Sequence, residues 1–322
     1  MARRIDWEKQ VGRHLKLRDL HIFCTVARCG SMGKAARELG VSQPTVSEAV
    51  ANLEHAFRVR LLDRSPRGVE PTTYGTALLK RGIAVFDELK QSSKDIEFLT
   101  DATTGELKVG CSESISATML PRLIQHFSRR YPRVTLQVDD VPSLALARPV
   151  LQDRRYDLVF ARLGPSPRDD PLPAELSIET LFDDQLVVAA GMRTKWARRR
   201  KIDLAELVDE PWILMIPSSW NYIGVAEAFQ ARGLAMPRIT LVTFSVHLRT
   251  HLLADGDFIT AFPSSLLHTN ARYFSLRSLP VDLPIRPWPV AVVTLKDRTM
   301  SPLVERFIEC AREVARSMKT KE

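Results

Sequence analysis

The chain has 322 residues, 45% of them hydrophobic, and its 46 lysines and arginines exceed its 38 aspartates and glutamates to give a formal net charge of +8. This length exceeds one typical hydrophobic core and predicts two or three domains. No apolar run approaches the roughly 18 residues of a membrane span, and no hydrophobic stretch follows the basic N-terminus as in a secretory signal, so we expect a cytoplasmic protein without a membrane partner.

The cysteines do not have the spacing of metal ligands. The four of them are Cys24, Cys29, Cys111 and Cys310. In a cytoplasmic protein such residues are reduced, mostly buried thiols rather than disulfides. We therefore expect no metal site and no cofactor.

The segment 32–51 has the pattern of a helix-turn-helix. One apolar stripe is formed by Met32, Ala35, Ala36 and Leu39, and a second by Val46, Ala49, Val50 and Leu53. Between them Gly40 supplies a stop, Ser42 a cap and Pro44 a first-turn residue for the second helix. An earlier helix with Leu20, Phe23, Cys24 and Ala27 on one face offers a third wall. The pattern indicates DNA binding, although a helical hairpin without a ligand remains an alternative.

The second helix leaves a short polar face pointing outward near its N-terminus. Pro44, Glu48 and Ala51 point away from the core, flanked by Thr45, Ser47 and Asn52. Such a face suits the major groove and contact with base edges.

A basic two-stranded wing is predicted next. The turn from Ser65 to Gly68 joins two short apolar runs, and Arg64 and Arg67 could pair with phosphates or enter a minor groove. Residues 1–80 contain 14 lysines and arginines against 8 aspartates and glutamates, so +6 of the net +8 lies there. A charge excess is often only a solvated face, but here it coincides with the helix-turn-helix and favours nucleic acid.

A long helix is expected over 73–100, with Thr72 as its cap. Apolar or small residues keep a heptad-like spacing at Leu78, Gly82, Val85, Leu89, Ser92, Ile96 and Leu99. This spacing favours pairing with a second copy of the helix, and packing against its own domain is the alternative. Paired chains would read two half-sites on DNA.

Beyond a polar break at 101–105 the chain alternates strands and helices. Strands are predicted around 107–111, 134–138 and 156–161, with a helix from Leu120 to Phe127 after the first of them. Further strands follow at 185–189, 212–216 and 290–294, and an amphipathic helix runs through Leu303, Phe307, Cys310 and Val314. The order predicts an α/β domain with a mostly parallel sheet.

The residues from Leu17 to Gly75 resemble the N-terminal region of LysR-type transcriptional regulators. The resemblance rests on Ser31, Ala35, Ala36, Leu39, Ser42, Gln43, Pro44, Ser47, Leu53, Glu54, Leu61, Leu62, Arg64, Thr72 and Gly75. Glu48 departs from the pattern, because relatives often place arginine after the serine equivalent to Ser47, and a carboxylate there would accept from cytosine and repel phosphate.

The resemblance implies a division of the whole chain. It comprises a winged helix-turn-helix DNA-binding domain (15–72), a long dimerising linker helix (73–100) and a two-lobed, periplasmic-binding-protein-like effector domain (105–322). Lobe I is expected to take 105–177 and 281–322, and lobe II 178–280. The DNA-contacting residues are then expected among Ser31, Gln43, Pro44, Thr45, Ser47, Glu48, Arg64 and Arg67.

Ligand sites in open α/β sheets lie beyond the carboxyl ends of strands, often at helix N-termini. By resemblance, Ser114 and Ser143 fall where LysR-type regulators hold an effector, often a carboxylate. Pro217, Ser218 and His247 could line the same cleft from lobe II. For each serine a plain helix cap is the alternative, and His247 could equally be a structural or surface residue.

No phosphate loop, nucleophile elbow or other catalytic motif stands in the sequence, so we expect a regulator without catalytic residues. A periplasmic-type solute-binding protein and a hydrolase with scattered active residues are alternatives, but neither explains residues 17–75. The expected partners are double-stranded promoter DNA, a small-molecule effector such as a carboxylate or other small metabolite, RNA polymerase and further copies of the chain, most simply as a dimer of dimers.

Overall fold

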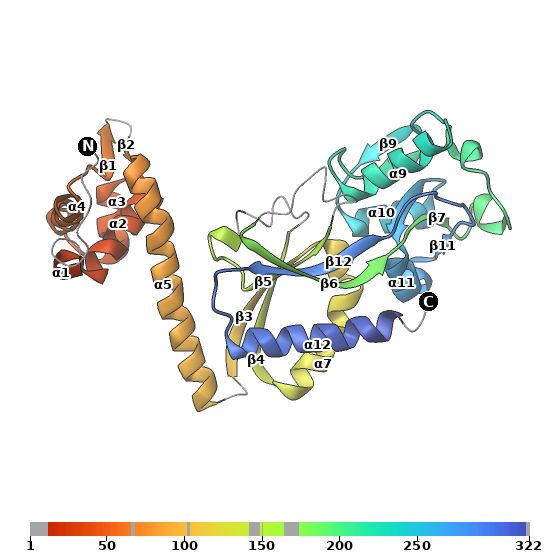
Figure 1. Cartoon of the computed structure of the whole chain (residues 1–322). Coiled ribbons are helices and arrows are strands. Elements are labelled where there is room, and N and C mark those ends of the chain that lie inside the picture. Colours follow the sequence, from red (N-terminus) through yellow and green to blue (C-terminus); the bar gives the residue numbers. More distant parts are fainter. Residues whose placement is uncertain are drawn as a thin grey trace. The chain divides into compact units, whose positions relative to one another are not determined.

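The computed structural model describes residues 12–65, 68–101, 104–141, 149, 151–163 and 174–319 (Figure 1). The chain divides into two compact units, residues 1–93 and 94–322, and each is described by itself. Among the described residues, none of the helices combines the length and the hydropathy that crossing a membrane requires.

The N-terminal unit begins with short helices, namely α1 (Gly12–His14), α2 (Leu17–Cys29), α3 (Met32–Leu39) and α4 (Gln43–Phe57). Of these, α3 and α4 each start at a serine cap. Gly40 follows α3 with a φ of 63°, in the left-handed region that glycine enters without steric cost. The Ser42 hydroxyl accepts a hydrogen bond from Thr45 N at 3.3 Å, and Pro44 lies in the first turn of α4. The predicted turn between the two helices is confirmed.

The apolar faces of α3 and α4 are buried as their spacing predicts. The buried residues are Met32, Ala35, Ala36, Val46, Ala49, Val50 and Leu53. On α2, however, the predicted stripe is only partly correct. Ile22 and Val26 join Leu20 and Phe23 in the core, whereas Cys24 and Ala27 are half-buried. The α2 side chains that share the core with α3 and α4 include Ile22 and Val26. Cys24 instead lies against the long helix that follows the wing, where a Cβ on Gly82 would be 2.8 Å from Cys24 Sγ.

The predicted wing is a hairpin of β1 (Leu62–Ser65) and β2 (Gly68–Pro71), in which Arg64 stands opposite Val69. Two contacts hold it to the helices. Val69 N donates to Gly30 O at 2.9 Å, and the Glu54 carboxylate accepts from Leu61 N at 2.7 Å. The wing is therefore tied to the ends of both α2 and α4.

The long helix α5 (Thr73–Thr100) occupies the predicted range. Its cap is Thr72, whose hydroxyl accepts from Gly75 N at 3.0 Å. Gly75 lies so close to the wing that a Cβ on it would be 2.0 Å from Leu61 O. The first turn of α5 thus packs against the backbone that precedes β1.

The second unit begins with the sheet of lobe I. Its strand order is β4-β3-β5-β12-β6, with β3 at Thr104–Cys111, β4 at Arg133–Asp140, β5 at Leu158–Arg162, β6 at Leu176–Asp184 and β12 at Trp288–Leu295. The short α6 (Glu113–Ser116) follows β3. The helices α7 (Met119–Arg130) and α12 (Pro302–Lys319) lie side by side against this sheet and share one core with it (Figure 1).

The sheet of lobe II has the order β11-β7-β10-β8-β9. Its strands are β7 (Leu186–Gly191), β8 (Trp212–Leu214), β9 (Ile239–Val242), β10 (Ile259–Pro263) and β11 (Leu276–Ser278). Its longer helices are α9 (Trp220–Ala231), α10 (Val246–Asp255) and α11 (Ser264–Phe274), and short 3-10 turns stand at Trp196–Arg198 and Leu204–Leu207.

Both sheets are mixed, which corrects the prediction of a mostly parallel sheet. In lobe I, β3 pairs in parallel with β4 and β5, but β12 pairs antiparallel with β5 and β6. In lobe II, β7 pairs antiparallel with β10 and β11, while β8 is parallel to its neighbours. The antiparallel pairs involve the strands that carry the chain between the lobes, because a strand that returns from the other lobe enters the sheet in the opposite direction.

The lobe boundaries also lie later than expected. Residues 178–184, which we assigned to lobe II, belong to β6 and pair along β12 in lobe I. Conversely, Val281, Leu283 and Ile285 pack in the core of lobe II rather than lobe I. The crossings therefore fall at Gln185 and just before Trp288. Hydrophobic spacing could not place them, since β6 and β7 are separated by a single residue.

Candidate nucleic-acid interface and ligand cleft

The N-terminal face of α4 presents short polar side chains to solvent. Gln43, Pro44 and Glu48 are exposed, whereas Thr45 and Ser47 are half-buried. The Thr45 hydroxyl lies 2.8 Å from the Ser42 hydroxyl, so its hydrogen-bonding atom is partly used by the cap. Small polar groups at the start of a helix can approach base edges closely.

The start of α3 lies beside this face. The Ser31 hydroxyl accepts from Lys34 N at 3.4 Å and so caps α3, which is a structural use of that side chain. A Cβ on Gly33 would be 3.6 Å from Gln43 Oε1, which places Gln43 against the first turn of α3. Ser31 and Gln43, both predicted from sequence, are thus brought together.

Some basic side chains around these helices are exposed to solvent, whereas Arg28 forms an ion pair. Arg64 on β1 is exposed, and Lys34 and Arg37 are exposed on α3, although sequence reasoning did not select the last two. Arg28 instead forms an ion pair with Glu38, whose pKa is lowered chiefly by the Arg28 hydrogen bond and then by one from Cys29. Arg67 lies outside the described residues.

A second candidate site lies between the two lobes, where Glu113 of lobe I contacts the N-terminus of α10 in lobe II. Its Oε2 accepts from Val246 N at 2.7 Å, and its Oε1 accepts from His247 N at 3.1 Å. Free N–H groups and the helix dipole make this end of α10 a site for an anion. The chain's own carboxylate occupies it.

The cavity beside this contact is small and lined from both lobes. Its volume is about 20 Å³, room for about one water molecule. The lining residues are Ser112, Glu113, Ser114, Asp140, Met215, Trp220, Phe244, Val246 and Arg249. The Ser114 side chain is buried, and its hydroxyl lies 3.3 Å from that of Ser112.

Arg249 and Asp140 bring opposite charges to this cavity. Arg249 is 1% exposed, stacks 4.4 Å from the Phe262 ring centroid and donates to Ala261 O at 3.4 Å. Its Nε has no hydrogen-bond partner among the described residues, and burial lowers its pKa to about 10 against the opposing effect of Glu113. Burial, and next the charge of Glu113, raise the pKa of Asp140. A ligand group of either charge would find a counter-charge here.

A buried ion pair stands where the chain leaves lobe I. Arg162 Nη1 at the end of β5 is 2.9 Å from Asp184 Oδ2 at the end of β6. Asp184 also accepts from Ser264 Oγ, Ser265 N and Ser265 Oγ at the start of α11. Because α11 belongs to lobe II, this network ties the two lobes together next to the crossing.

Family models match both parts of the chain. Residues 17–76 match the model described as a bacterial regulatory helix-turn-helix protein of the lysR family, and residues 100–316 match the LysR substrate binding domain. The chain belongs to the LysR family of transcriptional regulators.

A curated relative agrees with this assignment, and solved structures share the fold. The transcriptional regulator TdcA of Escherichia coli is 25% identical over 299 residues, which cover 92% of this chain and 93% of TdcA. A full-length OxyR variant from Pseudomonas aeruginosa matches with a TM-score of 0.64 at 23% identity, over 94% of this chain and 95% of that one. CbnR in complex with its target DNA matches with a TM-score of 0.53 at 24% identity, over 94% and 100%. The expected winged helix-turn-helix and periplasmic-binding-protein-like fold are confirmed.

In this LysR-family regulator only some of the predicted cleft residues meet. Ser114 lines the cavity, and Ser143 lies outside the described residues. Pro217 and Ser218 are exposed and do not line it. His247 contributes its backbone N–H, while its exposed side chain meets the His251 ring edge-on with ring centroids 4.4 Å apart.

Sequence reasoning missed the charged groups of the cleft. Glu113 lies inside the serine-rich run that it singled out, and its charge at the start of a helix was the available signal. The sequence signal for Arg249 was weaker, namely a charged residue among the apolar positions of α10. Its partners come from distant segments, so the sequence could not pair it with the cavity.

Proposed function

We propose that this regulator binds promoter DNA by placing the N-terminal turns of α4 in the major groove, with the wing against the phosphate backbone. The observation that carries this proposal is the exposed face of Gln43, Pro44 and Glu48, which lies against the first turn of α3 in a domain that also exposes Lys34 and Arg64. Thr45 and Ser47, at the edge of that face, would reach bases through small side chains.

The docking is tested by separating phosphate contacts from base contacts. Arg64→Ala should weaken binding on all sequences alike and reduce the slope of log affinity against log salt by about 1. Gln43→Ala should change which sequence is preferred and cost about 1–3 kcal/mol on the best site. Lys90→Ala removes an exposed charge from α5 and serves as the control. This docking would be refuted if both test variants bound operator DNA as the wild type does.

The linker helix supports a dimer. Large apolar side chains that follow the predicted heptad spacing are left exposed on α5, namely Val85, Leu89, Ile96 and Leu99, the last of them 81% exposed. A second copy of α5 would cover this row, and two such dimers would form a tetramer that spans successive half-sites. Leu89→Glu should dissociate the assembly in sedimentation experiments, whereas Lys90→Glu at the adjacent exposed position should not. The pairing would be refuted if the Leu89→Glu variant sedimented with the same assembly mass as the wild type.

The cleft between the lobes is proposed to bind a small-molecule effector when the lobes separate, and a carboxylate that takes the place of Glu113 at α10 suits it best. Support comes from the N-terminus of α10, the Ser114 hydroxyl and the buried Arg249, all within one cavity. An effector would act by changing the lobe geometry and so the spacing of the DNA-binding domains on the promoter, and thereby the contact with RNA polymerase in the cytoplasm.

The effector proposal is tested by thermal shift with a panel of small carboxylates and sugars. A ligand that stabilises the wild type should stabilise Ser114→Ala less, and Arg249→Met less still, because each variant removes a group from the cavity. Ser116→Ala, whose hydroxyl donates to Glu113 O outside the cavity lining, is the matched serine control. If the ligand shifted the melting temperature of all variants equally, neither Ser114 nor Arg249 would belong to its binding site.

A further inference from the structure

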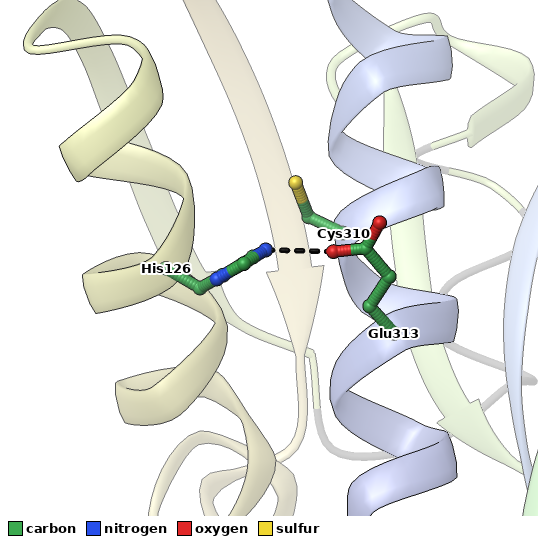
Figure 2. Close-up of side chains that lie close together, drawn as sticks. All are labelled: His126, Cys310 and Glu313. Carbon is green, nitrogen blue, oxygen red and sulfur yellow. Dashed lines mark hydrogen bonds and ion pairs between the residues drawn. The ribbon is translucent and has the colours of Figure 1, made fainter.

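A histidine, a cysteine and a glutamate meet where α7 packs against α12 in lobe I (Figure 2). His126 Nε2 is 2.7 Å from Glu313 Oε2. Cys310 Sγ completes the group, and the three ligand atoms all lie within 4.8 Å of one another. Since His126 and Glu313 are 187 positions apart, the cysteine spacing in the sequence could not reveal this cluster.

The three side chains are held by packed helices rather than by loops. Cys310 and Glu313 are three residues apart on α12 and so share one helix face. Next to His126, the Phe127 ring meets Phe307 edge-on with centroids 4.9 Å apart, which fixes α7 against α12. A ligand set on such a scaffold needs only side-chain rotation to close around an ion.

The distances are close to those of a tetrahedral zinc site. Bond lengths of about 2.0–2.3 Å to nitrogen, oxygen and sulfur put ligand atoms about 3.3–3.6 Å apart. The His126–Glu313 pair would open slightly and Cys310 Sγ would approach both. We propose that His126 Nε2, Cys310 Sγ and a Glu313 carboxylate oxygen bind a divalent transition-metal ion, zinc in particular, with water as a fourth ligand.

The charges around the cluster set the conditions for binding. Burial, and next the charge of Glu313, raise the pKa of the Cys310 thiol, while Arg130 lowers it. When a thiol binds a metal ion, its S–H bond breaks and the proton is released to solvent. Arg130 Nη1, 3.8 Å from Glu313 Oε2, competes for the same carboxylate, but its side chain is 58% exposed and can turn into water at little cost.

The site is tested by titrating the tag-free, full-length protein with Co²⁺ as the probe. We expect a thiolate-to-cobalt charge-transfer band in the near ultraviolet that saturates at about one ion per chain and is bleached by Zn²⁺. Cys310→Ser should abolish the band. His126→Gln and Glu313→Gln should each weaken the affinity more than tenfold, since even outer-shell changes at metal sites cost about 10–100-fold.

Matched controls separate this site from adventitious binding. Cys29→Ser replaces a partly exposed cysteine of the other unit, and Glu309→Gln replaces an exposed carboxylate on α12, so both should keep the band. If Cys310→Ser does not fold, the affinities of His126→Gln and Glu313→Gln test the proposal instead. Both side chains are about two-fifths exposed (41% and 42%), so replacing them should leave the fold intact. The absence of a saturable band, a band that survives Cys310→Ser, or unchanged affinity in His126→Gln would overturn the proposal.

Discussion

Replacing Glu113 with glutamine should loosen the contact between the lobes without disturbing either core. The carboxylate accepts from Val246 N at 2.7 Å and from His247 N at 3.1 Å. Glutamine keeps one acceptor oxygen but turns an amino group toward the other N–H donor. One hydrogen bond therefore becomes neutral and the other is lost.

The size of the effect follows from these two bonds. A hydrogen bond to a charged group contributes about 1.5–3 kcal/mol and a neutral one about 0.5–1.5 kcal/mol. Loss of the anion at the N-terminus of α10 adds about 0.3–1 kcal/mol. Relief of the repulsion between Glu113 and Asp140 offsets part of this sum. We expect a net weakening of about 2 kcal/mol, which is about 30-fold in the equilibrium between contact and separation.

Amide hydrogen exchange measures this contact directly, because Val246 and His247 supply the two donors. Glu113→Gln should speed exchange at both by about 30-fold, while Leu248 N, which donates to Ser245 Oγ at 3.1 Å, should be little affected. Glu227→Gln, the same change at an exposed position of α9, is the matched control. A change of less than about twofold at Val246 and His247 would refute the reasoning, and so would equal acceleration at Leu248, which would indicate fraying of α10.

Three further predictions, the first with a contrasting variant, test the packing and charge of the fold. Gly75→Ala would place a Cβ 2.0 Å from a backbone oxygen and should cost about 3 kcal/mol in urea unfolding, whereas Gly33→Ala, with 3.6 Å to a flexible side chain, should stabilise by about 0.5–1 kcal/mol. Arg162→Met should cost about 3–5 kcal/mol, because it leaves the buried Asp184 without its cation. The pKa of Asp140 is raised above its ordinary 3.8 in the folded protein, so the folded state holds the proton more tightly than the unfolded state does. The stabilisation from this proton is complete below pH 3.8 and is lost as the pH rises through the folded pKa. Asp140→Asn should therefore gain stability relative to wild type as the pH rises above 3.8, which urea titrations at a series of pH values would show.

The helix-turn-helix was predictable because its signals are local. The cap at Ser42, the stop at Gly40 and the apolar spacing of α4 each depend on neighbours within a few residues. The wing was predictable for the same reason. The sequence did not show that the Glu54 carboxylate accepts a hydrogen bond from Leu61 N and so ties the start of the wing to α4.

The linker helix shows how tertiary contacts divide a regular pattern. Spacing alone placed Gly82 and Leu89 on one seam. In the structure Gly82 lies against Cys24 and Leu20 of α2, where a Cβ would come within 2.8 Å of sulfur, whereas Leu89 is exposed. A glycine that is a weak residue for a coiled coil is thus required for close approach to α2. The heptad positions therefore divide between a residue that contacts α2 and residues that remain exposed.

The cleft could be located from sequence only as the ends of strands. Its chemistry depends on pairs that are far apart along the chain, such as Glu113 with Val246 and Arg162 with Asp184. Ser114 and Ser143 were the visible candidates through the family resemblance and their place after predicted strands, with a plain helix cap as the alternative. The charged residues gain their meaning only when the two lobes meet.

The Glu113 contact sets a requirement for any effector of this regulator. A ligand changes a conformational equilibrium only through unequal affinity for the two states. If the contact favours the joined lobes by about 2 kcal/mol, a ligand that reverses this preference to the same extent must bind the separated state about 10³-fold more tightly. A carboxylate that replaces Glu113 at α10 meets this condition most directly, because the two N–H groups it needs are available only when Glu113 has left them. Glu113→Gln should accordingly raise the apparent affinity for such a ligand, whereas a ligand with equal affinity for the joined and separated lobes should gain nothing from the substitution.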